Sequence, residues 1–454
     1  MARIKLWASA MAALLLAAAC VHETPAPAPA APVAEAAAPE SPAAAPEAPA
    51  RPQSVLMIGL DGLNPALLKD WDAPNLKALA ARGVQAEAMY PVMPSLTFVN
   101  FYSLATGLYP EHHGMVTNYP YDPTTGEIFD VATGPQQEKW WQGEPIWITA
   151  EKQGLPTAIM FWLGSEVAHD GVRPTIWTPY QHTKPYQERV DEVLAWFDKP
   201  ETERPRFAAV YFDRVDTAGH YTGPRSDKTK EALLEVDGYV GQLVDGLKAR
   251  GLLDTTDIIV VSDHGMARIE EEKVVEVGHF IDLKQLVVPQ FTGKYGGSAQ
   301  TFIQIYGKGD ALEAAYEGLK SVHEHIHVYR KGEMPAHYHM DHPTRGPDLL
   351  AVADPGWTMR TADVGGWSAP IPGNHGYDNH DPSMNATFIA AGPIFPEGIT
   401  VAPFENVNVY GMIACALGIM PAQTDGDAEV VERVTGGKCA APKPQFAVGT
   451  ASSN

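Results

Sequence analysis

The sequence predicts an α/β fold with a mostly parallel central sheet and helices on both faces. Segments of strand type and helix type alternate from residue 54 onward, which is the pattern of βαβ units. The strand-type segments are unbroken apolar runs, as expected for parallel strands buried on both faces. Acidic residues follow three of these runs, at Asp61, Asp216 and Asp263. Because ligands bind beyond the carboxyl ends of strands in such sheets, these positions predict a functional site.

The chain begins with a segment that predicts export, residues 1–20. Arg3 and Lys5 form a basic start, and residues 6–19 are apolar. This apolar run is shorter than the about 20 residues that span a membrane comfortably. We therefore interpret it as a signal peptide.

The end of the signal, LLAAAC, resembles a bacterial lipoprotein signal in which Cys20 becomes the lipidated first residue. Ala17 departs from that pattern, which usually has Leu at this position. The alternative is ordinary secretory cleavage after Ala19. Both alternatives predict an exported protein, and lipidation would place it in the periplasm or anchored to an outer membrane through Cys20 alone.

An Ala- and Pro-rich segment, residues 21–53, follows the signal and is expected to form an extended tether. One globular domain is expected over residues 54–440, and residues 441–454 form a C-terminal tail. The chain of 454 residues, 45% of them hydrophobic, is long enough to bury a sizeable core.

Within the domain, strand-type and helix-type segments can be assigned from their apolar patterns. Strands are expected at residues 54–60, 155–162, 206–212, 256–262, 299–306, 348–354 and 386–392. Helices are expected at residues 73–83, 188–199, 230–251 and 405–419.

The net charge of −22 excludes a protein that binds along a nucleic-acid polymer, because such binding depends on Lys and Arg contacts to phosphates. A small phosphate ester remains a possible substrate, since metal ions supply positive charge locally.

Two cysteines lie in the folded part, Cys415 and Cys439, in a chain expected to be exported and hence oxidised. The sequence leaves two alternatives open: a disulfide between these residues, or two free thiols. Neither Cys has a second Cys or a close His at zinc-finger spacing, so a structural zinc is not expected there.

The stretch at residues 94–114, PSLTFVNFYSLATGLYPEHHG, carries a candidate nucleophile, Thr97. A Thr in isolation is more often a cap or turn residue. The nucleophile hypothesis depends on six acidic and His residues elsewhere that would surround the Thr97 hydroxyl: Asp61, Asp216, His220, Asp263, His264 and His375.

These residue types favour a site with two zinc ions. Zinc binds His nitrogen and carboxylate oxygen, and two metals about 3.5–4 Å apart hold the attacking and leaving oxygens of an in-line displacement. A Thr hydroxyl at zinc would be held as an alkoxide, as zinc lowers the pKa of bound water to about 7. Thr97 would then attack phosphorus, and water would hydrolyse the resulting phospho-threonine. Manganese or cobalt are alternatives to zinc.

Five motifs together resemble the set found in the nucleotide pyrophosphatase/phosphodiesterase family of the alkaline phosphatase superfamily. They occur in the family's order over residues 54–420. The resemblance implies an alkaline-phosphatase-like catalytic domain. The motifs are GLDG (59–62), the stretch 94–114, VDTAGHYTGP (215–224), SDHGM (262–266) and GNHGYDN (373–379).

The resemblance also implies how the ligands divide between two zinc ions. The first set would be Asp216, His220 and His375, and the second Asp61, Asp263 and His264 together with Thr97.

By the same resemblance, Asn118 would donate to the negative charge that develops on the phosphate, and the backbone amide of Phe98 would assist. The nucleobase slot would be formed by Phe98, Tyr180 and Tyr211. Two positions depart from the family: Val215 replaces a common Pro, and Leu96 stands where several animal members carry Lys. Leu96 makes the phosphate pocket less basic.

The implied activity is hydrolysis of nucleotide phosphodiester or pyrophosphate bonds to nucleoside 5′-monophosphates, with a small nucleotide as substrate. One alternative keeps the mechanism but acts on phosphocholine, lysophospholipid or phosphonate substrates. Another is a binding protein without turnover, which the presence of all seven site residues disfavours. A sulfatase is excluded because the nucleophile motif has Thr and no Cys-x-Pro-x-Arg.

Several further residues are expected to be structural. The alternating His323, His325 and His327 could suggest a third metal site, but surface or structural roles are favoured for them and for His337, His339 and His342. The same holds for His112 and His113, which would brace the nucleophile loop, for Asp213, and for Trp140, Trp141 and Trp147 as lid or core residues.

Overall fold

The computed structural model describes residues 53–292, 299–361 and 370–439, all within one compact unit, residues 51–454. The signal, Cys20, nearly all of the predicted tether and the C-terminal tail lie outside the described residues. Among the helices of the described part, none is both long and apolar enough to cross a membrane.

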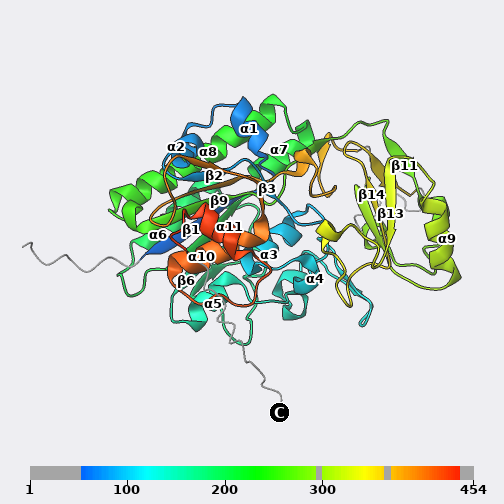
Figure 1. The fold of residues 1–454 in the computed structure, drawn as a ribbon, viewed down its shortest axis with the longest axis horizontal. Helices are drawn as coiled ribbons and strands as arrows, with labels where there is room; N and C mark the ends of the chain where they lie inside the picture. The colour runs from blue at the N-terminus through cyan, green and yellow to red at the C-terminus, as the bar shows by residue number, and fades with distance from the viewer. Residues whose placement is uncertain (1–52, 293–298, 362–369, 440–454) are drawn as a thin grey trace, which may run out of the picture. The chain divides into compact units, whose positions relative to one another are not determined.

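The central sheet has eight strands and runs through the middle of the unit (Figure 1). Its order is β18 (Ile399–Val401), β2 (Val84–Ala86), β17 (Phe388–Ala391), β9 (Thr256–Val261), β1 (Ser54–Leu60), β8 (Phe207–Phe212), β6 (Thr157–Met160) and β7 (Ile176–Thr178).

Strand β1 lies at the centre, and all seven of its residues are buried. It pairs in parallel with β8 and with β9, so Gly59 lies opposite both Tyr211 and Val261. Strands β6 and β7 continue the parallel part, whereas β17 is antiparallel to β9 and to β2. The mostly parallel sheet predicted from the sequence is confirmed.

Helices cover both faces of this sheet, as predicted (Figure 1). On one side lie α2 (Pro74–Ala81), α6 (Tyr186–Phe197), α7 (Arg214–Thr222) and α8 (Asp227–Ala249). On the other lie α3 (Thr97–Thr106), α5 (Ile146–Lys152), α10 (Val409–Leu417) and α11 (Ala428–Val434).

Two of these helices occupy segments where no helix was expected from the sequence. Helix α3 starts at Thr97 after the extended residue Leu96 and ends at Gly107, whose φ of 67° suits a glycine. Helix α7 contains Asp216 and His220, so their spacing of four places them one turn apart on the same helix face. Short helices depend more on tertiary packing than on local helix propensity, so the local pattern did not predict these two.

A second sheet is separate from the first and antiparallel. It has the order β12 (Phe302–Ile305), β14 (Leu349–Ala353) and β13 (Ile326–Arg330), and α9 (Asp310–Leu319) packs against it (Figure 1). This sheet has its own apolar cluster, which includes Ile303, Leu319 and Ala351. The strands expected at residues 299–306 and 348–354 therefore exist, but in this second sheet.

The remaining regular elements are short. They are α1 (Pro65–Asp70), α4 (Pro110–His113) and the strand pairs β3 (Met89–Tyr90) with β19 (Phe404–Glu405), β4 (Tyr121–Asp122) with β5 (Glu127–Ile128), β10 (Ala267–Arg268) with β16 (Gly373–Asn374), and β11 (Val274–Glu276) with β15 (Thr358–Arg360).

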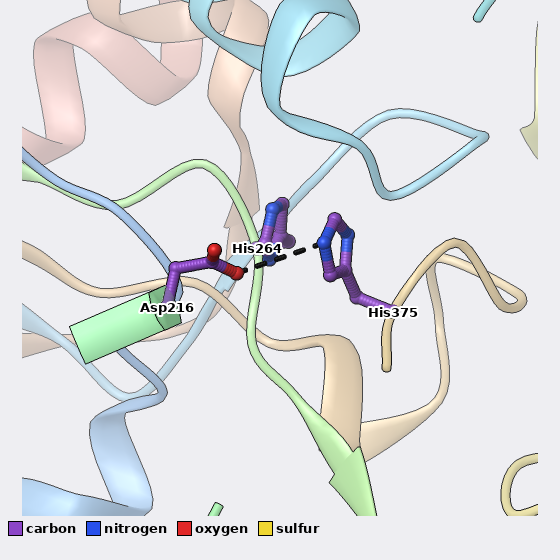
Figure 2. Close-up of side chains that lie close together, drawn as sticks. All are labelled: Asp216, His264 and His375. Atoms are coloured by element: carbon purple, nitrogen blue, oxygen red, sulfur yellow. Dashed lines mark ion pairs between the residues drawn. The ribbon is translucent and has the colours of Figure 1, made fainter. Parts of the chain in front are cut away.

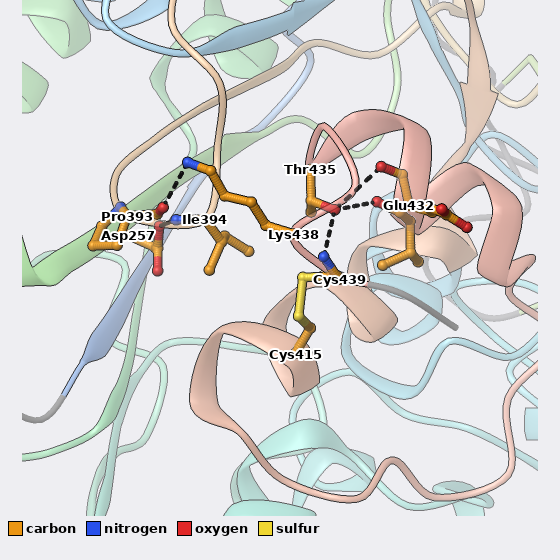
Figure 3. Close-up of a disulfide and its surroundings, with 9 residues drawn as sticks. Asp257, Pro393, Ile394, Cys415, Glu432, Thr435, Lys438 and Cys439 are labelled. Atoms are coloured by element: carbon orange, nitrogen blue, oxygen red, sulfur yellow. Dashed lines mark hydrogen bonds between the residues drawn. A yellow bond between two sulfur atoms is a disulfide. The ribbon is translucent and has the colours of Figure 1, made fainter. Parts of the chain in front are cut away.

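Cys415 and Cys439 form a disulfide, which decides the alternative that the sequence left open. Figure 3 shows this bond joining α10 to the segment that follows α11. Beside it, Lys438 Nζ donates to the carbonyl oxygen of Pro393 at 2.9 Å, so the end of the described chain is attached to the domain at two points.

Candidate functional site

Three Asp residues meet at the carboxyl ends of adjacent central strands. Asp61 directly follows β1, Asp263 lies two residues beyond the end of β9, and Asp216 is in the first turn of the helix after β8. Gly62 allows their close approach: it has a φ of 72°, and a Cβ there would lie 2.8 Å from Asp216 Cα. Its N–H also donates to Asp263 Oδ1 at 3.1 Å. The GLDG motif therefore brings the three carboxylates together.

The second predicted ligand set gathers around His264 Nε2. This nitrogen lies 3.5 Å from Asp61 Oδ1 and 3.1 Å from Asp263 Oδ2. The hydroxyl of Thr97 is 3.3 Å from the same nitrogen. The candidate nucleophile is thus in direct contact with the candidate metal ligands.

The first predicted set gathers around Asp216 Oδ1. His220 Nε2 lies 3.3 Å from this oxygen and His375 Nε2 lies 3.6 Å from it, and the two nitrogens are 3.1 Å apart. Figure 2 shows the Asp216 carboxylate facing His375, with the ring of His264 beside them. The rings of His264 and His375 are stacked at 3.5 Å, so the two sets form one continuous cluster.

Hydrogen bonds to the backbone orient each of the three imidazoles. Their Nδ1 atoms donate to carbonyl oxygens: that of His375 to Ser95 at 2.7 Å, that of His220 to Gly373 at 2.9 Å, and that of His264 to Gly265 at 2.8 Å. A ring that donates through Nδ1 presents Nε2 as its free ligand atom. All three Nε2 atoms point into the cluster.

The carboxylates leave oxygens for a cation to bind. Asp61 Oδ1, Asp216 Oδ1 and Asp263 Oδ2 are buried and accept no hydrogen bond from the described residues. A buried carboxylate oxygen without a partner is unfavourable unless a metal or another positive group neutralises it. The donor set of carboxylate oxygens and imidazole nitrogens therefore fits divalent zinc.

Burial and the closeness of the charged groups also shift the pKa values of the side chains in this cluster. Burial, together with the charges of Asp263 and Asp216, raises the pKa of Asp61 well above its usual range. Burial also raises the pKa of Asp216, although His220 and His264 act in the opposite direction. Burial and the two neighbouring imidazoles lower the pKa of His375 and keep it neutral, as a metal ligand must be. Burial alone would lower the pKa of His264, but the charges of Asp263 and Asp216 outweigh it and raise this pKa.

Thr97 is the first residue of α3, where the helix N-terminus favours negative charge on a bound phosphate. Asn118 lies beside it, and its Oδ1 accepts a hydrogen bond from the Phe98 N–H at 3.0 Å. The family resemblance implies that this N–H assists Asn118 at the phosphate. In the structure the Phe98 N–H is already used, and it orients Asn118 so that the Nδ2 donor remains available.

A cavity of about 590 Å³ opens beside Thr97 and is lined by Phe98, Asn118, Tyr180 and Tyr211. The volume lies within the range of roughly 300–1,000 Å³ of small-molecule sites. Tyr180 is 47% exposed at its wall, whereas Tyr211 is only 7% exposed. A neighbouring cavity of about 280 Å³ shares Asn118 and is lined by Leu96, His220 and His375.

A protein-family model matches most of the chain. The model described as type I phosphodiesterase / nucleotide pyrophosphatase matches residues 55–378. The chain belongs to this family.

Members of the family from several sources are similar to the chain. The venom phosphodiesterase CdcPDE of Crotalus durissus collilineatus is 34% identical over 381 residues, which cover 82% of this chain and 45% of that protein. Human ectonucleotide pyrophosphatase/phosphodiesterase family member 1 is 34% identical over 82% of this chain and 40% of its own length. A pyrophosphatase/phosphodiesterase of Schizosaccharomyces pombe is 35% identical over 82% of this chain and 78% of its own. The chain thus spans less than half of the venom and human relatives.

Solved structures of the family have the same fold. Murine ectonucleotide pyrophosphatase/phosphodiesterase 5 superposes with a TM-score of 0.78 and 27% identity over 84% of this chain and 100% of that chain. An inactive variant of that protein, solved in complex with AMP, has the same TM-score of 0.78 and identity of 27%. The alkaline-phosphatase-like fold expected from the motifs is confirmed.

The family motifs did not indicate the groups that orient the ligands. These are the carbonyls of Ser95, Gly265 and Gly373, and the hydroxyl of Tyr211, which donates to Asp61 Oδ2. Backbone carbonyls carry no sequence signal. A role in the nucleobase slot was predicted for the ring of Tyr211 only, because nothing in the sequence shows which group its hydroxyl contacts.

The side chains of His325 and His327 contact Asp354, outside this cluster. His325 Nδ1 and His327 Nε2 lie 2.8 Å and 2.7 Å from the two oxygens of Asp354. His323 and His325 pack on Trp357. Among the described residues, two groups of three have potential ligand atoms that all lie within 4.8 Å of one another: Asp216, His264 and His375, and Asp61, Asp263 and His264. The surface cluster of His323, His325 and His327 does not form such a group.

The other residues expected to be structural also have partners. His337 pairs with Asp378, His339 with Glu111, and His342 contacts Gln142. These contacts connect segments that are distant in the sequence.

Of the two His residues in α4, His113 contacts the helix that carries Thr97, whereas His112 contacts a different segment. His113 Nε2 lies 2.8 Å from Ser103 Oγ in α3, and His112 pairs with Asp425 at 2.7 Å. Trp140, Trp141 and Trp147 are buried in the core. Asp213 accepts from Tyr186 at 3.0 Å and pairs with the buried Arg189 at 3.4 Å.

Proposed function

We propose that this chain is a two-zinc phosphodiesterase that hydrolyses nucleotide phosphodiester or pyrophosphate bonds to nucleoside 5′-monophosphates through phospho-Thr97. One observation carries the proposal: three Asp and three His side chains form one cluster that contacts the Thr97 hydroxyl through His264, and Thr97 lines a cavity with aromatic walls. Family membership supports the reaction class.

In this proposal Asp216, His220 and His375 hold one zinc, and Asp61, Asp263, His264 and Thr97 hold the other. When bound, the ions would supply Lewis-acid stabilisation of the attacking and leaving oxygens. His264 Nε2 belongs to both close groups, and the proposal assigns it to the ion that Asp61 and Asp263 would hold.

Thr97 Oγ1 forms the new bond to phosphorus, and the bond from phosphorus to the leaving oxygen breaks. The leaving group departs with the electron pair, and the Thr97 proton passes to solvent. Asn118 Nδ2 donates a hydrogen bond to the non-bridging phosphate oxygen, where negative charge develops. Water then cleaves the Thr97–phosphate bond and releases the monophosphate.

The cavity beside Thr97 would hold the nucleoside. Phe98 is braced by Phe129 at 5.7 Å and by Trp141 at 6.5 Å, so it offers a fixed ring for stacking, and the exposed Tyr180 forms another wall. Stacking of a base on an aromatic ring contributes about 1–3 kcal/mol.

The domain boundaries and the location belong to the same proposal. Residues 54–440 form the catalytic domain, residues 1–20 direct export, and residues 21–53 tether the domain to a lipid on Cys20. Incorporation of labelled fatty acid by the full chain, and its loss in Cys20→Ser, would test the anchor. A wild-type chain without label would favour cleavage after Ala19.

The test of function compares turnover of three nitrophenyl esters by the full chain: those of thymidine monophosphate, phosphorylcholine and phosphate. Each is measured with and without a chelator, beside the metal content. We expect two zinc ions per chain and a chelator-sensitive preference for the thymidine ester. Preference for the choline ester would replace the nucleotide by a phosphocholine substrate. Zinc binding without turnover of any ester would contradict the enzymatic proposal.

A further inference from the structure

Tyr211 has a second connection besides the cavity that it lines. Its hydroxyl donates a hydrogen bond to Asp61 Oδ2, and both side chains are buried, with 7% and 2% exposure. Asp61 is one of the proposed zinc ligands. A single side chain therefore joins the wall of the proposed nucleotide cavity to a ligand of the metal site.

The ring of Tyr211 is held in place from several sides. Phe101 packs edge-on at 5.2 Å with an interplanar angle of 90°, and Tyr180 lies 6.2 Å away. Phe101 reaches this position because residue 59 is Gly, where a Cβ would lie 2.8 Å from the Phe101 ring. The Tyr211 carbonyl also accepts from Arg189 Nη1 at 2.8 Å. The hydroxyl consequently has one fixed position, at Asp61.

The backbone on both sides of this hydrogen bond is fixed as well. Tyr211 lies opposite Gly59 in the parallel register of β1 and β8. The Asp61 N–H donates to the Phe212 carbonyl at 3.0 Å. Tyr211 and Asp61 are thus attached to adjacent central strands, and neither can move away without breaking the sheet.

The consequence for Asp61 is that its two oxygens differ. Oδ2 is engaged by the Tyr211 hydroxyl, whereas Oδ1 accepts no hydrogen bond from the described residues and lies 3.5 Å from His264 Nε2. A carboxylate that is anchored through one oxygen presents the other in a fixed direction. We infer that Tyr211 is a positioning residue of the metal site, which holds Asp61 as a ligand through Oδ1 alone.

This inference rests on the proposed function and separates two roles of one residue. The ring forms part of the cavity wall, and the hydroxyl acts through Asp61. Tyr211→Phe removes only the hydroxyl. Tyr102→Phe is the matched control, because Tyr102 is also fully buried and its hydroxyl has no hydrogen-bond partner among the described residues.

The experiment measures zinc affinity of the full chain by competition with a chelator, for the wild type and both variants. We expect Tyr211→Phe to bind zinc about 10–100-fold more weakly, as is typical when a group that orients a ligand is removed. Tyr102→Phe should bind zinc like the wild type. At limiting zinc, Tyr211→Phe should lose kcat and recover it when zinc is added, with KM for the thymidine ester unchanged because the ring remains.

The visible spectrum of the cobalt-substituted proteins gives a second readout, since it reports the ligand geometry directly. It should change in Tyr211→Phe and stay unchanged in Tyr102→Phe. Wild-type zinc affinity and an unchanged cobalt spectrum in Tyr211→Phe would overturn the inference, while leaving the proposed function intact. A wild-type chain that binds no divalent metal would overturn both.

Discussion

Thr97 Oγ1 lies 3.3 Å from His264 Nε2. His264 Nδ1 donates to the Gly265 carbonyl, so the Nε2 atom of the ring faces Thr97. The same His264 Nε2 lies 3.5 Å from Asp61 Oδ1 and 3.1 Å from Asp263 Oδ2. The candidate nucleophile and a candidate metal ligand are thus in direct contact.

Thr97→Ala should abolish turnover while zinc binding is retained. The variant removes the attacking oxygen but leaves all six Asp and His ligands in place. Measurement of kcat on the thymidine ester together with zinc content tests this. Thr97→Ser, which keeps a hydroxyl, should retain part of the activity. Turnover by Thr97→Ala equal to that of Thr97→Ser would rule out Thr97 as the nucleophile.

Asn118→Ala should lower kcat by about 10²–10³-fold, the usual effect of losing one donor to a developing negative charge. Asn118→Asp should be more impaired, because it keeps the acceptor for the Phe98 N–H but replaces the Nδ2 donor with a negative oxygen. Steady-state kinetics at saturating zinc measure both variants. Higher activity in Asn118→Asp than in Asn118→Ala would show that the contact to Phe98, and not the donor, matters.

Removal of the disulfide should destabilise the domain without changing the site. The bond joins Cys415 to Cys439 across 24 residues of sequence, and closing a loop of this length stabilises a protein by roughly 3 kcal/mol in the chain-entropy model. Urea unfolding of the Cys415→Ser, Cys439→Ser double variant measures the loss. Reduced wild type should match the double variant. Equal stability of oxidised and reduced wild type would contradict the prediction.

Asp257 should make the domain less stable at high pH. Burial raises the pKa of Asp257 to about 6, and its Oδ1 accepts from the Ile394 N–H at 3.0 Å (Figure 3). Between about pH 4 and pH 6, Asp257 therefore keeps its proton in the folded state but has released it in the unfolded state, where its pKa is near 3.8. By linkage, stability falls as pH rises from about 4 to about 6 and stays lower above that range.

The variant Asp257→Asn removes this charge. It should raise the free energy of unfolding at pH 8 by at most about 3 kcal/mol, since one pKa unit corresponds to about 1.4 kcal/mol. At pH 4, where Asp257 is largely protonated, it should have little effect. Urea unfolding at both pH values, with chelator present so that metal does not contribute, checks the difference. An equal effect at pH 4 and pH 8 would exclude titration of Asp257 as the cause.

The sequence by itself determined the central elements and the residues of the candidate site. The apolar runs of β1, β8 and β9 are local patterns, and Asp61, Asp216 and Asp263 follow them directly or within a few residues. Since the carboxyl ends of parallel strands meet at one edge, their convergence follows from the strand order. The motif spacing likewise singled out Thr97, His264 and the other ligands that the structure brings together.

Only the tertiary structure decided which residues contact one another across the chain. Strands β12 and β14 have the pattern of strands, but packing placed them in a separate antiparallel sheet. The Tyr211 hydroxyl donates a hydrogen bond to Asp61, which is 150 residues away in the sequence, and the Phe98 N–H donates one to Asn118. Cys415 found Cys439 because α11 folds back on α10. Such contacts join residues that are distant in the chain, so their energy depends on packing of the whole domain and leaves no periodic signal in the sequence.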